Sequence, residues 1–156
     1  MTTRQQELDL KIVNAPNKTQ YRVLSAVTKV PKGKVTTYGH IAELIGKPRS
    51  YSRVVGQNLK HCKLIIKQLN ETLDDESKKI DQNSFPWWRI LSQGGSLAKR
   101  GNSGEAKQKT KLEEEGLEFV GSGNKKHIDM KEYGWFPSKV EYKDVKDEEV
   151  DFDKEE

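Results

Sequence analysis

The sequence has 156 residues, enough for one domain with short tails, and its 33% hydrophobic and 33% charged residues predict a modest core. A single cysteine excludes an internal disulfide and favours a reducing compartment. No apolar run reaches membrane-spanning length, and the N-terminus carries no apolar signal core. We therefore expect an intracellular protein without a membrane partner.

The net charge of +4 is unevenly distributed along the chain. Residues 139–156 hold nine acidic residues and four lysines, a net charge of −5 that leaves +9 on residues 1–138. A basic body favours a polyanionic partner, although ordinary solubilising charge explains it as well. We interpret 139–156 as an acidic disordered tail, which either only solvates the protein or docks on a partner domain through its scattered apolar residues.

Residues 1–17 show no sustained pattern and predict a flexible N-terminal arm before a domain that spans 18–138. From Tyr21 to Val30 the apolar residues recur with helical spacing, and Thr19 is a possible N-cap. The segment 31–34, with Lys32 and Lys34, then turns the chain.

Two further short helices follow with a tight connection between them. Thr37 is a fair N-cap for the first, and Gly46 ends it. Ser50 is expected to cap the second, at about 51–60. One stripe of this helix is polar and consists of Arg53, Gln57 and Lys60, with Ser52 and His61 beside it. The pair predicts a helix-turn-helix whose polar stripe suits a DNA groove, while an ordinary solvated helix face is the alternative.

The segment 85–91 contains two of the three tryptophans and predicts a short buried strand. Neighbouring strand residues point to opposite faces, so Trp87 and Trp88 are expected to face different surroundings; the alternative is that both indoles belong to the core. Before this strand, 64–69 could extend a helix or begin a hairpin, and 70–84 predicts an exposed loop.

The remaining chain predicts a basic loop at 99–104, a helix from Ser103 to Glu115 that Gly116 ends, and extended pieces at 117–120 and 128–130. The fold class is therefore mainly α with short strands. His40, His61, His127 and Cys62 lack the ligand spacing of a zinc motif, and we expect no metal or other cofactor.

With these pieces in order, residues 18–136 resemble the DNA-binding domain of the O6-alkylguanine-DNA alkyltransferases, and more closely their non-enzymatic relatives, the alkyltransferase-like proteins. Four segments carry the resemblance: VPKGKVTTYGHIAELIGKP (30–48), SRVVGQNLK (52–60), FPWWRI (85–90) and SLAKRGNSGEAKQKTKLEEEG (96–116). The resemblance implies a winged helix-turn-helix-like domain of the alkyltransferase type.

The resemblance also implies that the chemistry of the enzymes is missing. Their strand reads Pro-Cys-His-Arg, where the cysteine accepts the alkyl group and the histidine and a glutamate activate it. Here Trp87 stands at the cysteine position, Trp88 at the histidine position and Glu115 at the glutamate position. An indole offers neither a thiolate nor a general base. Cys62 is remote from the pocket in the motif order, so we do not expect it to be a relocated nucleophile.

What the resemblance retains is the binding apparatus for a flipped base. Arg53 corresponds to the arginine finger, Tyr38 to the tyrosine that pushes the flipped nucleotide's backbone, and Arg100 to an arginine that stacks on the modified base. A core or capping role is the alternative for Tyr38. The expected lesion pocket consists of Trp87, Tyr38, Arg100, Ser103, Gly104 and Val54. The expected DNA contacts are Arg53, Tyr38, Thr37, Ser52, Gln57, Lys60, Lys34 and Lys99.

Three departures from the family pattern stand out. One residue is added around Arg49, Cys62 falls near the family's hinge asparagine, and 63–84 is a longer insertion than usual.

The preferred hypothesis is a monomeric protein that flips O6-alkylguanine out of duplex DNA without transferring the alkyl group and flags the lesion for nucleotide excision repair. We expect it in the nucleus of a eukaryote, or otherwise in the cytoplasm or nucleoid. The alternatives are an active or residual alkyltransferase and a helix-turn-helix regulator of undamaged DNA.

Overall fold

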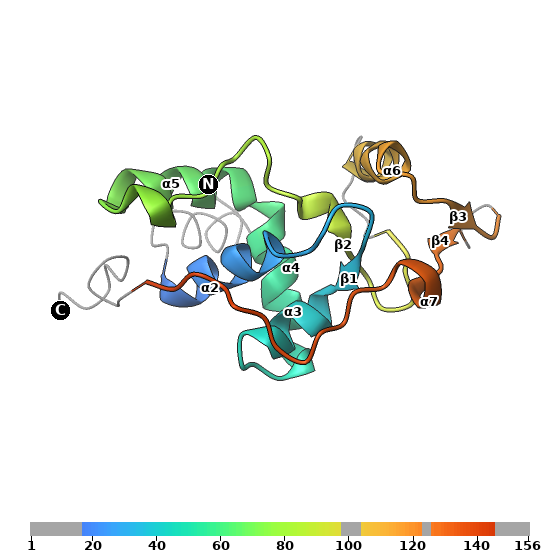
Figure 1. Ribbon diagram of the computed structural model, residues 1–156, viewed down its shortest axis with the longest axis horizontal. Helices are drawn as coiled ribbons and strands as arrows, with labels where there is room; N and C mark the ends of the chain where they lie inside the picture. The colour runs from blue at the N-terminus through green and yellow to red at the C-terminus, as the bar shows by residue number, and fades with distance from the viewer. Residues whose placement is uncertain (1–16, 98–103, 123–125, 146–156) are drawn as a thin grey trace, which may run out of the picture.

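The computed structural model describes residues 17–97, 104–122 and 126–145, which form an elongated, mainly helical domain (Figure 1). Four helices cluster at one end of it: α2 (Lys18–Val27), α3 (Tyr38–Leu44), α4 (Ser52–Lys60) and α5 (Cys62–Thr72). The other end holds α6 (Gly104–Glu114), the antiparallel strands β3 (Phe119–Val120) and β4 (His127–Ile128), and the short helix α7 (Met130–Tyr133). The predicted class, mainly α with short strands, is confirmed.

A parallel pair of short strands joins the two ends. Strand β1 (Thr36–Thr37) lies beside β2 (Ile90–Leu91), with Thr36 opposite Ile90 and Thr37 opposite Leu91. Strand β1 leads directly into α3, and β2 follows directly after the segment with the two tryptophans. This pairing therefore sets the first helix of the helix-turn-helix beside the Trp-Trp segment.

Helix α2 begins at a capping box. The Asn17 side chain accepts a hydrogen bond from Gln20 N at 2.9 Å, and the Gln20 side chain accepts one from Asn17 N at 2.9 Å. Two of the amides that a helix start leaves unpaired are thus satisfied. The helix was predicted correctly, but the cap is Asn17 rather than Thr19.

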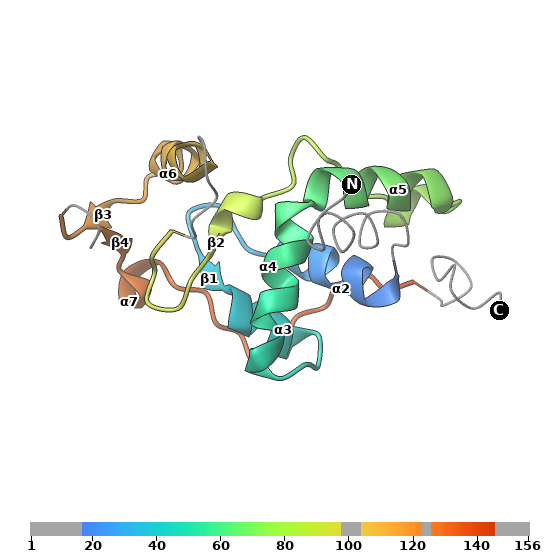
Figure 2. The same cartoon turned by 180° about the vertical axis from the view of Figure 1, so that it is seen from behind.

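Helices α3 and α4 pack against each other and form the predicted helix-turn-helix. Thr37 caps α3 as expected, because its hydroxyl accepts a hydrogen bond from His40 N at 3.1 Å. Gly46 ends α3 with a φ of +81°, a conformation that favours glycine. The prediction of a Ser50 cap is wrong, since the 3-10 turn η1 (Arg49–Tyr51) runs straight into α4 and leaves no extended cap residue. Figure 2 shows α4 running from α3 to α5.

The segment after α4 is more structured than its polar sequence predicts. Helix α5 continues to Thr72, so the helical alternative for 64–69 is the correct one. Beyond it, the predicted exposed loop includes the 3-10 turn η2 (Glu76–Lys78) and two buried residues, Leu73 and Ile80. The Asn70 side chain fixes Ile80 by donating to its carbonyl at 2.8 Å and accepting from its amide at 3.0 Å.

The two tryptophans do not lie on a strand. They belong to the 3-10 turn η3 (Trp87–Arg89), and β2 begins only at Ile90. Trp87 N donates to Phe85 O at 3.0 Å and Arg89 N to Pro86 O at 3.1 Å. Pro86 has no N–H group to donate to a neighbouring strand. The turn instead gives the Trp87 and Arg89 amides hydrogen-bond acceptors within the same segment. The predicted strand at 85–91 is therefore wrong for Trp87 and Trp88.

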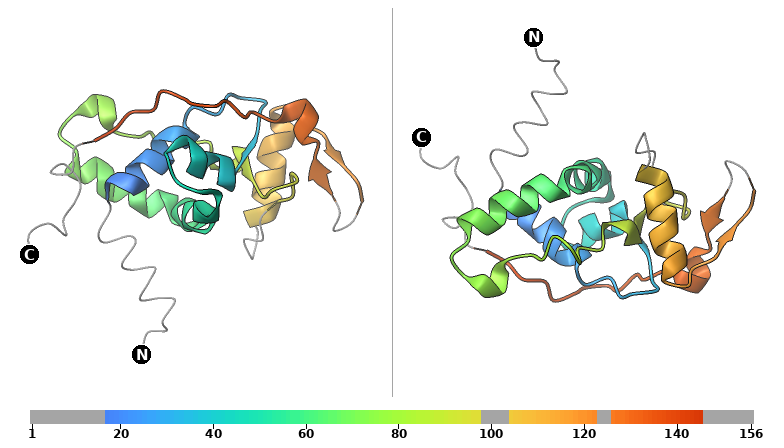
Figure 3. Two further views of the ribbon diagram at one scale, coloured as in Figure 1. Left: turned by 90° about the horizontal axis from the view of Figure 1, so that it is seen from below. Right: turned by 90° about the horizontal axis from the view of Figure 1, so that it is seen from above.

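Residues 134–145 form an extended C-terminal strap that crosses α2 and α3 (Figures 1 and 3). Trp135 N donates to Val35 O at 2.8 Å, and His40 Nε2 lies 2.8 Å from Pro137 O. Near its end, Asp144 pairs with Arg22 at 2.8 Å and Val145 is buried. The predicted disordered tail from 139 thus starts too early; 146–156 and the predicted arm at 1–16 lie outside the described residues.

Two groups of buried side chains make up the core. The larger lies among α2, α3, α4 and α5 and includes Leu24, Ile41, Val55 and Ile65. The smaller lies under α6 and consists of Val35, Leu91, Leu112, Leu117 and Ile128. No helix in the described part of the chain is both long enough and apolar enough to span a membrane.

Candidate functional site

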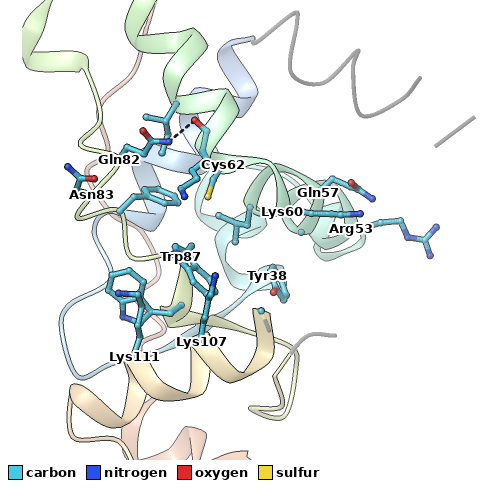
Figure 4. Close-up of a pocket in the computed structure, with 17 residues that line it drawn as sticks. Tyr38, Arg53, Gln57, Lys60, Cys62, Gln82, Asn83, Trp87, Lys107 and Lys111 are labelled. Atoms are coloured by element: carbon cyan, nitrogen blue, oxygen red, sulfur yellow. Dashed lines mark hydrogen bonds between the residues drawn. The ribbon is translucent and has the colours of Figure 1, made fainter. Parts of the chain in front are cut away.

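A cavity of about 810 Å³ opens between the two ends of the domain; we call it the Trp cavity (Figure 4). One wall is formed by the tryptophans of η3 and by α6, which contributes Gly104, Lys107 and Lys111. The opposite wall comes from Tyr38 and from the α4 residues Arg53, Gly56, Gln57, Leu59 and Lys60. The third side is formed by Cys62, Lys63 and Ile66 of α5 together with Gln82, Asn83 and Phe85.

Trp87 and Trp88 share one wall of this cavity. Their rings meet edge to face, with centroids 6.0 Å apart and planes at 86°. Both side chains are half-buried, and both line the cavity. The two indoles still pack on different groups of the core, Trp87 on the larger and Trp88 on the smaller, so the expectation of different surroundings is confirmed for their packing but not for the cavity that they share. The result is a broad aromatic wall rather than a single indole.

A buried network holds Trp88 in place. Its indole Nε1 donates to Glu115 Oε2 at 2.9 Å, and Arg89 Nη2 pairs with the same oxygen at 2.6 Å. Gly33 N donates to Glu115 Oε1 at 3.1 Å. Burial acts to raise the pKa of Glu115, but the hydrogen bonds from Arg89, Trp88 and Gly33 outweigh it and hold that pKa below its ordinary value. Glu115 is thus a carboxylate whose ionised form anchors Trp88, Arg89 and the Gly33 turn.

Two cations pack on the Trp88 ring as well. Lys111 Nζ lies 4.6 Å from its centroid and the Arg89 guanidinium carbon 5.5 Å. Such contacts with an aromatic face are attractive. Together with the bond to Glu115, they fix Trp88 against Trp87.

The outer face of α4 carries the polar stripe predicted from the sequence. Arg53 and Lys60 are exposed, and Gln57 lies between them on the same helix. In Figure 4 these three side chains extend from α4 away from Trp87. Arginine and lysine on an exposed helix beside a cavity suit contacts with nucleic-acid phosphates.

Residues 18–117 match the family described as 6-O-methylguanine DNA methyltransferase, DNA binding domain.

The chain belongs to this family.

Its relatives include an alkyltransferase-like protein and a DNA base-flipping protein. Alkyltransferase-like protein 1 of Schizosaccharomyces pombe is 36% identical over 118 residues, which cover 74% of this chain and 93% of the relative. The DNA base-flipping protein of Vibrio parahaemolyticus is 33% identical over 116 residues, or 74% of this chain and 94% of the relative. The resemblance to the alkyltransferase-like proteins is thereby confirmed.

Solved structures of the S. pombe protein share the fold. Atl1 in complex with damaged DNA containing O6-carboxymethylguanine matches with a TM-score of 0.58 and 35% identity, over 76% of this chain and 96% of that one. A second complex of S. pombe ATL with DNA matches with a TM-score of 0.57 and 33% identity, over 86% and 100%. The alkyltransferase-type fold predicted from the sequence is thus confirmed.

The structure brings part of the expected alkyltransferase-like pocket together. Tyr38, Trp87 and Gly104 all line the Trp cavity, as does Arg53. Val54 does not: its side chain is 39% exposed, because α4 directs Val55 rather than Val54 into the core. Arg100, Ser103 and Lys99 lie outside the described residues.

The other expected DNA contacts have mixed surroundings. Thr37 is buried and its hydroxyl caps α3, so its visible role is structural. Ser52 is half-buried at the start of α4, and Lys34 is exposed just before β1. The exposed members are therefore the ones free to approach a phosphate backbone.

Sequence reasoning missed several residues of the Trp cavity. Lys107 and Lys111 stand four residues apart on α6, so both lie on one helix face. This spacing is the sequence signal that could have predicted that the two lysines line one surface. Cys62 also lines the cavity, because α5 begins immediately after α4 at its edge. Gln82 and Asn83 line it through a fold of the insertion that local pattern does not reveal. Among the described residues, no group of three or more His, Cys, Asp or Glu side chains gathers to hold a metal.

Proposed function

We propose that this protein binds O6-alkylguanine in duplex DNA, turns the modified nucleotide into the Trp cavity and transfers no alkyl group. The single observation that carries the proposal is the aromatic wall of Trp87 and Trp88, which stands at the enzymes' nucleophile and base positions and lines a cavity beside the exposed face of α4. A flipped base costs a few kcal/mol of unstacking, which stacking on such a wall offsets.

The proposal that no alkyl group is transferred is supported by the groups at Trp87 and Glu115. Alkyl transfer needs a nucleophile activated by a base or by a lowered pKa. Trp87 supplies no thiolate, and Glu115 is engaged by Arg89 and Trp88. A lesion bound without reaction stays in place, so we propose that the complex marks it for nucleotide excision repair, in the nucleus if the cell has one. We also propose that the protein acts as a monomer.

The binding proposal is tested with matched duplexes that carry either O6-methylguanine or guanine at one position. The protein is expected to bind the modified duplex more tightly, and equal affinities would refute the proposal. Trp87→Ala should weaken lesion binding roughly tenfold, the scale of one base stacked on an aromatic ring. Trp87→Phe, which keeps a flat wall, should retain most of the preference.

A second candidate function rests on Cys62, since its thiol lines the same cavity. In that case the thiol would lose its proton to solvent, and the thiolate would attack the alkyl carbon. A sulfur–carbon bond would form as the carbon–oxygen bond breaks, and guanine would keep the electron pair of that bond and take up a proton from solvent. Incubation with duplex carrying a labelled methyl group distinguishes the two. We expect no label on the protein; label that appears on wild type but not on Cys62→Ser would establish the transferase instead.

A further inference from the structure

The Trp cavity is uniformly basic. Among the described residues that line it, five are cations and none is a carboxylate; the cations are Arg53, Lys60, Lys63, Lys107 and Lys111. Elsewhere in the described residues, Arg22, Arg49, Lys79 and Arg89 each pair with an acid. The five cavity cations take part in none of these ion pairs. Like charges around one cavity repel each other, and an anion bound there relieves that repulsion.

Four of the five cations fall into two groups by position. Arg53 and Lys60 extend outward from α4, where a DNA backbone would run (Figure 4). Lys107 instead rises from α6 alongside Trp87, and one turn later Lys111 is held over the Trp88 ring at 4.6 Å. Lys107 makes no hydrogen bond or ion pair with any described residue. Its ammonium is therefore available at the wall on which the flipped base would stack.

The cavity also has room beyond a small alkyl group. It extends from Trp87 to Cys62 and to the insertion residues Gln82 and Asn83. Gln82 Nε2 donates to Lys63 O at 3.1 Å, which ties the insertion to the start of α5 and defines that side. A volume of about 810 Å³ is within the range of sites that enclose drug-sized ligands, so a methyl substituent would occupy only a small part.

We propose that the Trp cavity prefers O6-alkylguanines whose substituent ends in a carboxylate, and that Lys107 is the residue that pairs with it. The inference rests on the proposed function, because it places the modified guanine against Trp87. An ammonium donates charge-assisted hydrogen bonds to a carboxylate, which a neutral group of the same shape accepts more weakly. The DNA phosphates, the other source of anions, are left to Arg53 and Lys60.

The experiment compares four duplexes of one sequence, with guanine, O6-methylguanine, O6-carboxymethylguanine or its neutral carboxamide analogue at one site. Affinities are measured at one salt concentration for the full chain and for Lys107→Gln and Lys109→Gln. Lys109 lies on the same helix but outside the cavity lining, so its variant controls for the change in net charge. Lys107 is exposed on a helix, where glutamine has a similar propensity, so both variants should fold.

Wild type is expected to bind the carboxylate about fivefold more tightly than the carboxamide, the scale of a partly exposed charged contact. Lys107→Gln should abolish this ratio, and Lys109→Gln should preserve it. If wild type binds the carboxylate and carboxamide duplexes equally, the inference is overturned. The proposed function still stands in that case, provided that wild type binds the O6-methylguanine duplex more tightly than the guanine duplex. A ratio that persists in Lys107→Gln overturns the assignment to Lys107. Equal binding of all four duplexes overturns the proposed function itself.

Discussion

Replacing Glu115 by glutamine tests the network behind the aromatic wall. The carboxylate joins the turn at Gly33, the Trp88 indole and the Arg89 guanidinium, and the side chains of Arg89 and Glu115 are only 15% and 8% exposed. Removing one member of a buried ion pair costs about 3–5 kcal/mol, because the remaining charge stays buried without a partner. Glutamine keeps an acceptor for Trp88, and Arg89 keeps its bond to Val30 O, so we expect a loss of about 2–3 kcal/mol.

Thermal unfolding followed by circular dichroism measures this loss. For a domain of this size, it corresponds to a decrease in Tm of about 10 °C at neutral pH. Glu114→Gln, which removes an exposed carboxylate one residue earlier, is the matched control and should change Tm by about 2 °C or less. A Glu115→Gln protein as stable as the control would refute the role assigned to the network.

The same variant has a defined pH dependence. The folded-state pKa of Glu115 lies below its ordinary value of 4.5, so the folded protein favours the ionised form. This contribution is fully present above that ordinary pKa and is lost as the pH falls through the lower folded-state pKa. The difference in Tm between wild type and Glu115→Gln should therefore be constant near neutral pH and shrink in acid. A difference that grows as the pH falls would contradict the lowered pKa.

Three further predictions concern binding. Arg53→Ala should weaken binding to the O6-methylguanine duplex more than to the unmodified one, because an inserted finger acts only when the nucleotide is flipped; an equal loss would make Arg53 a simple phosphate contact. Lys60→Gln should weaken both duplexes equally and reduce the slope of log affinity against log salt by about one, and an unchanged slope would exclude that contact. Cys62, the single cysteine, lines the cavity, so bound duplex with the lesion should slow its reaction with N-ethylmaleimide more than unmodified duplex does. Mass spectrometry follows the modification, and equal rates with the two duplexes would place the flipped base elsewhere.

Local signals in the sequence predicted most helices and their ends. The Thr37 cap and the Gly46 and Gly116 ends were correct, since each depends on one residue's hydrogen bonding or on its access to positive φ. Errors arose where two local signals competed. Aromatic and β-branched residues at 85–91 favour a strand, but Pro86 turns the chain first. At the start of α2, Asn17 prevailed over Thr19 because Gln20 completes its capping box.

The composition of the Trp cavity could be predicted only in part. Trp87 and Tyr38 come from motif positions, so the resemblance carries them. Lys107, Cys62 and Gln82 come from segments that meet only in the folded domain. The insertion in particular reads as a polar loop, yet Asn70 and the buried Ile80 fold it back against the core and bring Gln82 to the cavity.

The sequence by itself determined that positions 87 and 88 carry indoles, which have neither a thiol nor an imidazole. It also determined the helix-turn-helix, which depends on local periodicity and caps. Only the tertiary structure decided that both indoles form one wall, that Glu115 is an anchored anion and that Lys107 stands beside the wall. These features depend on contacts between segments distant in the chain, which side-chain packing establishes and no local pattern encodes.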